Sequence, residues 1–217
     1  DASIFIGSVH IMRCLVLAEA LKEQGDMVSF ASRPQKGDLI EFVRKKGFKV
    51  YELVTPTHWQ TPRNSADYAA WLQVPWQKDV ESLIQQVDNI DLLIVDHYGL
   101  NADWELFAKN KLKCKLFAID DLVRKHRSDL ILDQTLLRNP SEYKAINPNS
   151  VILAGCDFTL LKHNFITYRE KALETTMSSS GVNVLISMGG VDQPNATLQV
   201  LQELAKIPGK KPLVTVL

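Results

Sequence analysis

Residues able to do chemistry gather in four places along this sequence of 217 residues. They are His10 with the preceding Gly7 and Ser8, the segment Asp96-His97-Tyr98-Gly99, the pair Asp120-Asp121, and the pair Gly189-Gly190. Each follows a short apolar run or precedes an expected helix. In open α/β proteins, phosphorylated ligands bind where parallel strands end and helices begin. The four places therefore predict a site for a phosphorylated small molecule.

His10 is the strongest candidate for a reacting side chain. A lone histidine more often caps a helix or packs in a core, but its place directly after a small-residue loop favours a functional role. The positive end of a helix disfavours an imidazolium ion, so we expect a neutral ring near pH 7. A neutral ring suits a base or a group that orients water.

The segment after the apolar run 91–95 supplies a carboxylate, an imidazole and a phenol. Asp96 has two equal interpretations, as a structural acceptor of backbone N–H bonds or as a catalytic group. His97 and Tyr98 gain nothing from burial at a strand end. We therefore expect at least Tyr98 to line the ligand cleft.

The pair Asp120-Asp121 also has two interpretations. Two aspartates after a strand make good turns and N-caps. Together with His97 and His126 they could instead bind a metal, but these residues lack compact ligand spacing. No metal site is predicted, and Asp121 is kept as a candidate for substrate binding.

Gly189-Gly190 lies between an expected strand and an expected helix. Two residues without a Cβ let backbone N–H groups approach a phosphate, so the pair is a candidate nucleotide-binding turn. Asp192 and Asn195, which follow, are interpreted as caps. The sequence has neither a Walker loop nor a complete Gly-x-Gly-x-x-Gly motif, so ATP hydrolysis and dinucleotide redox chemistry are unsupported and no cofactor is predicted.

Hydrophobic periodicity predicts the elements that must position these residues. Helices are expected at 10–24, 37–46, 76–87, 102–110 and 196–206, and strands at 27–31, 49–53, 91–95, 115–119, 130–132, 151–154, 182–187 and 212–217. Strand and helix alternate along the chain. This order predicts an α/β fold built on a doubly wound parallel sheet.

The sequence predicts two α/β domains. Residues 1–174 form the first, which carries the histidine, and residues 175–181 are small and polar, as in a linker. Residues 182–217 begin a second unit. A segment of about forty residues is too short to bury a core of its own, so we expect it to open a larger, nucleotide-binding domain.

Charge and cysteine content narrow the classes of partner. Lys and Arg number 25, as do Asp and Glu, and this zero net charge argues against nucleic acid and membrane surfaces. The basic runs 44–46 and 124–127 are expected to be solvated faces. No apolar run is long enough to span a membrane. Cys14, Cys114 and Cys156 are expected to be buried free thiols of a reducing compartment, so a cytoplasmic protein is predicted.

The motifs occur in the same order in a known family. They are residues 1–13, Val95 to Leu100, Ile119 to Asp121, Asp129 to Gln134, Gly155 to Phe165 and Ser187 to Asp192. In this order they resemble the nucleotide-sugar hydrolases of pseudaminic acid biosynthesis, which serves flagellin glycosylation. These enzymes release UDP from UDP-2,4-diacetamido-2,4,6-trideoxy-β-L-altropyranose. They are similar to two-domain GT-B glycosyltransferases.

This resemblance implies a metal-independent hydrolase with a UDP-sugar as its partner. His10 would position or deprotonate the water that attacks the anomeric carbon, and Tyr98 would lie in the sugar pocket. Gly7 and Ser8 would face the sugar and diphosphate, and Gly189-Gly190 would begin the UDP site. The other candidates for substrate binding are Asp96, His97 and Asp121. The oligomeric state is not predicted.

One position departs from the family pattern. Val9 stands where the family commonly has a glycine, and its Cβ limits φ and the approach of the backbone to a ligand. A noncatalytic nucleotide-sugar binding module, which Val9 favours, is therefore one alternative. Another is a GT-B glycosyltransferase, for which Trp59, Trp71 and Trp76 could form a sugar platform as well as core. The first strand and later nucleotide-binding segments are absent, so this chain alone is expected to hydrolyse little or no substrate.

Overall fold

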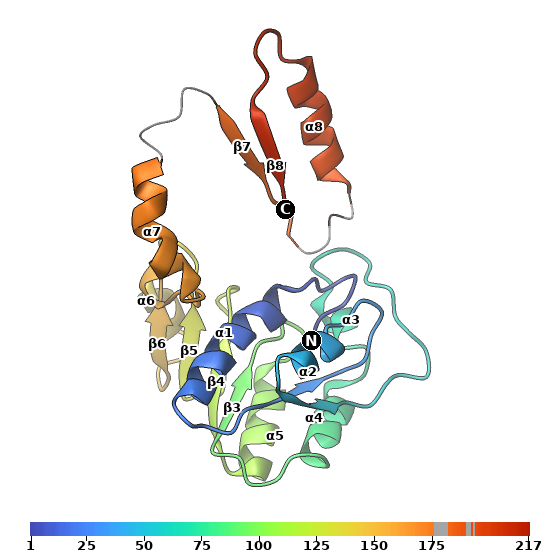
Figure 1. Ribbon diagram of the computed structural model, residues 1–217. Helices are drawn as coiled ribbons and strands as arrows, with labels where there is room; N and C mark the ends of the chain where they lie inside the picture. The colour runs from blue at the N-terminus through green and yellow to red at the C-terminus, as the bar shows by residue number, and fades with distance from the viewer. Residues whose placement is uncertain (176–181, 190–191, 193) are drawn as a thin grey trace.

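The computed structural model describes residues 1–175, 182–189, 192 and 194–217 (Figure 1). Its helices are α1 (Val9–Glu23), α2 (Ile40–Lys45), α3 (Tyr68–Trp71), α4 (Trp76–Ile84), α5 (Ala102–Leu112), α6 (Pro140–Lys144), α7 (Asn164–Thr175) and α8 (Ala196–Lys206), with a short 3-10 helix at Cys156–Phe158. Its strands are β1 (Ser29–Ser32), β2 (Lys49–Glu52), β3 (Leu92–Val95), β4 (Lys115–Ile119), β5 (Leu130–Asp133), β6 (Val151–Ala154), β7 (Asn183–Ile186) and β8 (Leu213–Val216). Every predicted helix and strand is present, whereas α3, α6 and α7 were not predicted.

The strands pair in parallel throughout the described part of the chain. Four of them form one sheet in the order β3-β4-β5-β6, and β1-β2 and β7-β8 form two separate pairs. Because the order follows the sequence, each connection crosses back over the sheet, as the alternation of strand and helix predicted. The α/β fold class is confirmed.

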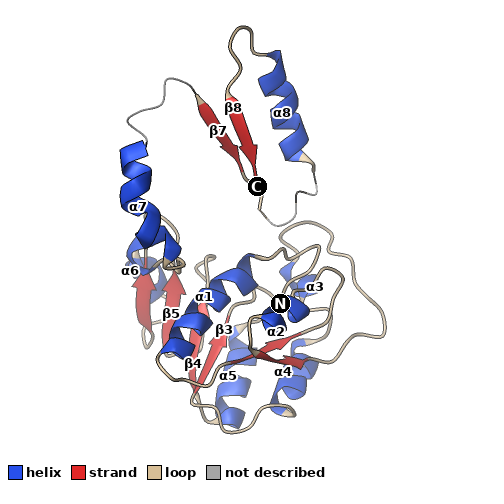
Figure 2. Ribbon diagram, in the orientation of Figure 1, coloured by secondary structure: helices blue, strands red, loops and turns tan. Residues whose placement is uncertain are grey.

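Strand β4 shows that both faces of the four-stranded sheet are covered (Figure 2). Leu116 and Ala118 join the core cluster that includes α4 and α5, whereas Phe117 and Ile119 join the cluster that α1 packs against. Alternate residues of a strand point to opposite faces, so one strand can contribute to two cores. Helices on both faces are what a doubly wound sheet requires.

Helix α1 is held on two sides, and this fixes where it begins. Its residues Ile11, Leu15 and Ala18 belong to the core cluster with α2 and β2, while Cys14 and Leu17 pack toward β4 and β5. Before the helix, the Gly7 N–H donates to the Ser3 carbonyl at 2.8 Å, closing a tight turn. Gly7 has φ +77°, a conformation that favours glycine.

The C-terminal unit and the domain boundaries remain predictions. The predicted linker falls, apart from Thr175 at the end of α7, on residues outside those described.

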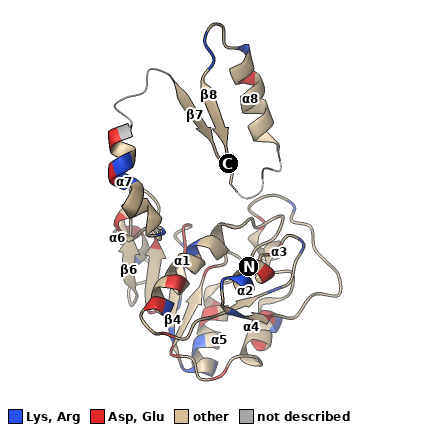
Figure 3. Cartoon of the chain, viewed as in Figure 1, with Lys and Arg blue, Asp and Glu red and all other residues tan. Residues whose placement is uncertain are grey.

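Acidic and basic residues alternate along helices such as α7 (Figure 3). In the described residues, no helix combines the length and apolar character that crossing a bilayer would take.

The cysteines differ from the expectation in one case. Cys114 is buried and Cys14 is half-buried, but Cys156 is exposed. Cys156 follows the edge strand β6, where the sheet has no further neighbour to cover it. The prediction of three buried thiols was therefore wrong for Cys156.

Candidate active site

The site is built around His10 and Asp96, which are 86 positions apart in sequence. His10 is the second residue of α1 and Asp96 directly follows β3. The His10 Nδ1 atom lies 2.6 Å from Asp96 Oδ1, and the two residues are 5% and 8% exposed. The start of α1 thus stands over the carboxyl end of β3, where both residues were predicted to act.

The acceptor chemistry of Asp96 fixes the tautomer of His10. An ionised carboxylate can only accept hydrogen bonds, so the proton of the short contact must reside on His10 Nδ1. The Arg13 Nη2 atom is also 3.5 Å from Nδ1, but it is a donor at a longer distance and so cannot reverse this assignment. In a neutral ring, the second nitrogen, Nε2, is then left with a lone pair for a proton.

Asp96 is held by side chains. Arg13 grips it with two parallel bonds, Nε to Oδ2 at 2.6 Å and Nη2 to Oδ1 at 2.7 Å, and the Cys14 thiol lies 3.5 Å from Oδ2. Burial alone would raise the pKa of Asp96, but hydrogen bonds from Arg13 and His10 lower it to about 2. Asp96 is therefore a carboxylate at neutral pH. Its anchoring partners are side chains rather than the backbone N–H groups considered from the sequence.

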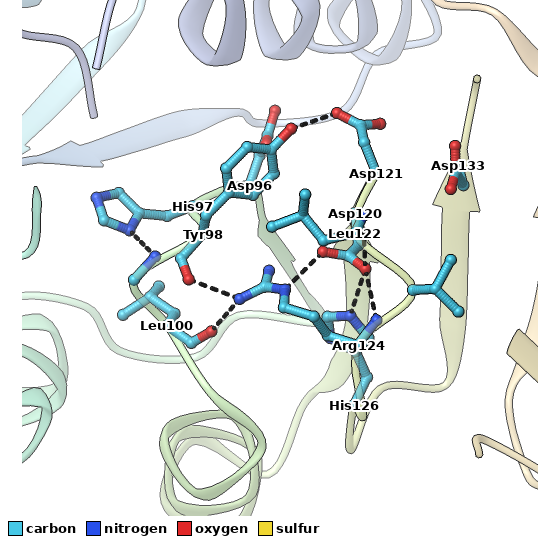
Figure 4. Close-up of polar contacts among 12 residues, drawn as sticks. Asp96, His97, Tyr98, Leu100, Asp120, Asp121, Leu122, Arg124, His126 and Asp133 are labelled. Atoms are coloured by element: carbon cyan, nitrogen blue, oxygen red, sulfur yellow. Dashed lines mark hydrogen bonds and ion pairs between the residues drawn. The ribbon is translucent and has the colours of Figure 1, made fainter. Parts of the chain in front are cut away.

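Tyr98 and Asp121 form the second half of the site (Figure 4). The Tyr98 hydroxyl donates to Asp121 Oδ2 at 2.5 Å, and Arg13 Nη1 donates to the same oxygen at 2.7 Å. The Tyr98 ring stands edge-on to the His10 ring, with 4.7 Å between centroids. Burial and the Asp121 carboxylate raise the pKa of Tyr98, so it is a phenol at neutral pH. His10, Asp96, Tyr98 and Asp121 thus meet in one cluster.

An aromatic wall borders this cluster on the side of α3. Trp71 stacks on Tyr98 with 5.9 Å between centroids and approaches His10 at 6.2 Å. The other two tryptophans lie elsewhere, since Trp59 is 54% exposed and Trp76 packs against Phe107. Of the three, Trp71 is the one that contacts the rings of Tyr98 and His10, and it is buried.

Gly99 allows α3 to approach this closely. A Cβ at Gly99 would lie 2.6 Å from the Tyr68 carbonyl oxygen and 2.9 Å from the His97 ring. Both contacts are too short for a side chain to occupy. The glycine after Tyr98 therefore has a packing reason, which spacing in the sequence did not reveal.

His97 does not join the cluster. Its Nδ1 accepts the Gly99 N–H at 3.0 Å (Figure 4). Its Nε2 faces Asp1 Oδ2 at 3.5 Å. Burial lowers the pKa of His97 well below its usual value, which keeps the ring neutral. The geometry gives His97 a role in shaping the loop after β3 rather than a direct place beside Tyr98 and Asp121.

The two aspartates after β4 point to different surroundings. Asp121 faces Arg13 and Tyr98, whereas Asp120 is fully buried and binds Arg124 Nε at 2.7 Å and the Tyr143 hydroxyl at 2.9 Å. Arg124 also donates to the carbonyl of Tyr98 at 2.6 Å (Figure 4). Asp120 therefore braces the loop that presents the site. Asp120 therefore has the structural role that the sequence allowed, whereas Asp121 contacts the cluster of His10, Asp96 and Tyr98.

The basic run 124–127 is not simply a solvated face. Lys125 and Arg127 are exposed, as expected, but Arg124 is half-buried and His126 is buried. His126 Nδ1 lies 2.6 Å from Glu105 Oε1, and its Nε2 lies 3.4 Å from Asp120 Oδ2. Buried carboxylates draw these two cations inward, which a count of charges along the sequence does not show.

We expect the free energy of unfolding to fall between about pH 6.5 and pH 9 because of His126. Burial alone would lower its pKa, but hydrogen bonds with Asp120 and Glu105 raise it to about 9. A raised folded-state pKa stabilises the fold below the unfolded value near 6.5 and loses that effect as the pH rises through 9, at a cost of up to about 3 kcal/mol.

Urea unfolding of wild type and His126→Gln at pH 6 and pH 9 measures this effect. The stability gap between the two proteins should shrink at pH 9. The exposed His163 offers a matched control, and His163→Gln should track wild type. An equal gap at both pH values would contradict the assignment.

The remaining candidates are Ser8, the metal ligands and the glycine pair. Ser8 is the N-cap residue of α1, without a side-chain bond to the helix.

Among the described residues, no group of three or more His, Cys, Asp or Glu is arranged to hold a metal. Gly189 has φ +76° and open space around it, while Gly190 lies outside the described residues. The Asp192 carboxylate accepts the N–H groups of Ala196 and Thr197, so it caps α8 as expected.

Sequence reasoning missed Arg13 and could not separate Trp71 from the other tryptophans. Arg13 is 6% exposed although α1 is otherwise solvated on one side. A usable signal was present, because residues three apart share a face of a helix and Arg13 lies three after His10. For Trp71, no periodic signal marks the one-turn helix α3.

Fold and site together define a class, namely doubly wound α/β proteins that hold a histidine–aspartate pair at the carboxyl edge of a parallel sheet. Comparison with known proteins narrows the class. The chain is 30% identical over 207 residues to the UDP-2,4-diacetamido-2,4,6-trideoxy-beta-L-altropyranose hydrolase of Campylobacter jejuni. This confirms the resemblance predicted from the motifs.

The match covers nearly all of this chain but a smaller share of the similar protein. The match covers 95% of this chain but 64% of the hydrolase. An uncharacterized protein of Methanocaldococcus jannaschii is 24% identical over 215 residues, covering 94% of this chain and 38% of that protein. No family model matches the chain.

Proposed function

We propose that the natural protein at full length hydrolyses a UDP-sugar, with the diacetamido-trideoxy-altropyranose nucleotide named for the C. jejuni relative as the first substrate to test. The observation that carries this is the His10–Asp96 pair, with 2.6 Å between Nδ1 and Oδ1 at the start of α1. Its chemistry is that of a general base, and its place is where a phosphorylated ligand binds.

In the proposed reaction, His10 Nε2 accepts a proton from water as the water oxygen bonds to the anomeric carbon. The bond from that carbon to the diphosphate oxygen breaks, and UDP leaves with the electron pair. Attack from the opposite face inverts the anomeric centre. Positioning the water and stabilising the charge on UDP account for the rate, so this chain's residues need no covalent intermediate.

The sugar is proposed to lie against the half-buried Tyr98, whose ring is supported by the buried, stacked Trp71. Asp121, which already accepts from Tyr98, would accept a further hydrogen bond from the sugar through Oδ1, an oxygen without a partner among the described residues. Gly7 and Ser8 at the start of α1 would face the diphosphate. The UDP site is proposed to begin at Gly189-Gly190.

Val9 does not weigh against this function. It is the first residue of α1, has no positive φ and is 57% exposed, so its backbone needs no glycine. The side chain points outward and leaves the His10–Asp96 contact undisturbed. The noncatalytic alternative therefore loses the feature that favoured it.

UDP release tests the proposal. We expect the full-length protein to release UDP from the altropyranose nucleotide without an added acceptor. The chain of 217 residues should release little or none. A glycosyltransferase would instead require a sugar or lipid acceptor, and a binding module would bind the nucleotide without turnover. Robust turnover by the 217-residue chain would refute the proposed need for further nucleotide-binding segments, and a full-length protein without turnover would refute hydrolysis.

A further inference from the structure

Arg13 lies one turn after His10 on α1, at the centre of the cluster. It is 6% exposed, which is unusual for an arginine unless its donors are paired. Three of its guanidinium nitrogens are engaged. Nε and Nη2 grip Asp96, and Nη1 binds Asp121.

The bonds to Asp96 form a fork, with 2.6 Å and 2.7 Å to the two carboxylate oxygens. Two parallel bonds fix the plane of a carboxylate, whereas a single bond would let it rotate. The oxygen that Nη2 contacts, Oδ1, is the one that lies 2.6 Å from His10 Nδ1. Arg13 thus determines where the acceptor for the His10 proton stands.

The third bond connects the two halves of the site. Asp96 follows β3 and Asp121 lies beyond the end of β4, two neighbouring strands of the sheet. Asp121 Oδ2 accepts from Arg13 at 2.7 Å and from the Tyr98 hydroxyl. A single guanidinium therefore holds two carboxylates, one beside the base and one beside the proposed sugar pocket.

We propose that Arg13 is a positioning residue that aligns Asp96 with His10 and so holds the His10 ring proton on Nδ1. The inference rests on the proposed hydrolysis for its kinetic consequence. Its structural consequence, the tautomer of His10, can be measured without turnover.

Two variants test the fork. Arg13→Met removes the whole guanidinium, and we expect kcat for UDP release to fall at least about 10²-fold. Arg13→Lys keeps a positive charge but cannot form the two parallel bonds to Asp96, so kcat should fall here too. The exposed Arg44 on α2 is the matched control, and Arg44→Met should match wild type.

Nitrogen-15 NMR of His10 makes the test independent of activity. Wild type should show the tautomer protonated at Nδ1, and Arg13→Met should lose this single tautomer. Should Arg13→Met not fold, Arg13→Lys decides, because unchanged kcat and an unchanged Nδ1 signal would overturn the proposal. An Nδ1 signal of Arg13→Met that superimposes on that of wild type would overturn it too. If wild type shows the expected tautomer but no UDP release, hydrolysis fails and the positioning role stands.

Discussion

Replacing His10 with glutamine is expected to lower kcat for UDP release by about 10³-fold, within the range for loss of a general base. Glutamine retains a side chain of similar reach but cannot accept a proton at neutral pH. The ring nitrogen Nε2 is the nitrogen of His10 that remains for a proton, since Nδ1 is engaged by Asp96. UDP affinity should change by less than about threefold, because the diphosphate is proposed to bind backbone N–H groups.

Single-turnover UDP release and calorimetric UDP titration separate these two effects. The exposed His163, which directly precedes α7, provides the control, and His163→Gln should behave as wild type. If His10→Gln kept wild-type kcat, His10 would have no part in proton transfer. If it lost UDP binding along with turnover, the histidine would be acting in nucleotide recognition instead.

The sequence was most informative where a regular hydrophobic period is bounded by residues that end a helix or strand. The strand at Lys115–Ile119 coincides with the predicted range, and α8 coincides with 196–206. Both have a regular apolar pattern and clear ends. The missed elements α3 and α6 span four and five residues, too few for a period of 3.6 to be visible. Helix α7 is long enough, but the residues at its start, Phe165 and Ile166, are exposed rather than aligned on a core.

The site could be predicted as a set of candidates, though not as a geometry. The rule that strand ends meet at one edge brought His10, Asp96 and Tyr98 together correctly. It could not tell Asp120 from Asp121, because both follow β4 and only the pleat decides which one faces the cluster. Nor could it identify Arg13, whose role depends on a carboxylate 83 positions away. Long-range pairing of buried charges is the part of the site that local pattern does not encode.

Asp96→Asn is expected to have an effect as large as loss of the base, although Asp96 touches no reacting atom. An asparagine can present its NH₂ group to His10 Nδ1, which would then accept the bond and carry its proton on Nε2 instead. That is the wrong tautomer for a base. The equivalent change in serine proteases, a different fold, costs about 10⁴-fold in kcat, and we expect a fall of about 10³-fold or more here.

The same substitution should also destabilise the protein, which makes a stability measurement part of the test. Arg13 would keep its charge in a buried site with Asp121 as its remaining carboxylate partner, and breaking a buried ion pair costs about 3–5 kcal/mol. Urea unfolding measures that cost, and kinetics at a temperature where the variant is folded isolate the catalytic effect. Asp103→Asn, an exposed position on α5, is the control for loss of a carboxylate. A folded Asp96→Asn protein with normal kcat would show that His10 does not need Asp96 to set its tautomer, and the base would then have to be oriented by the Tyr98 and Trp71 rings alone.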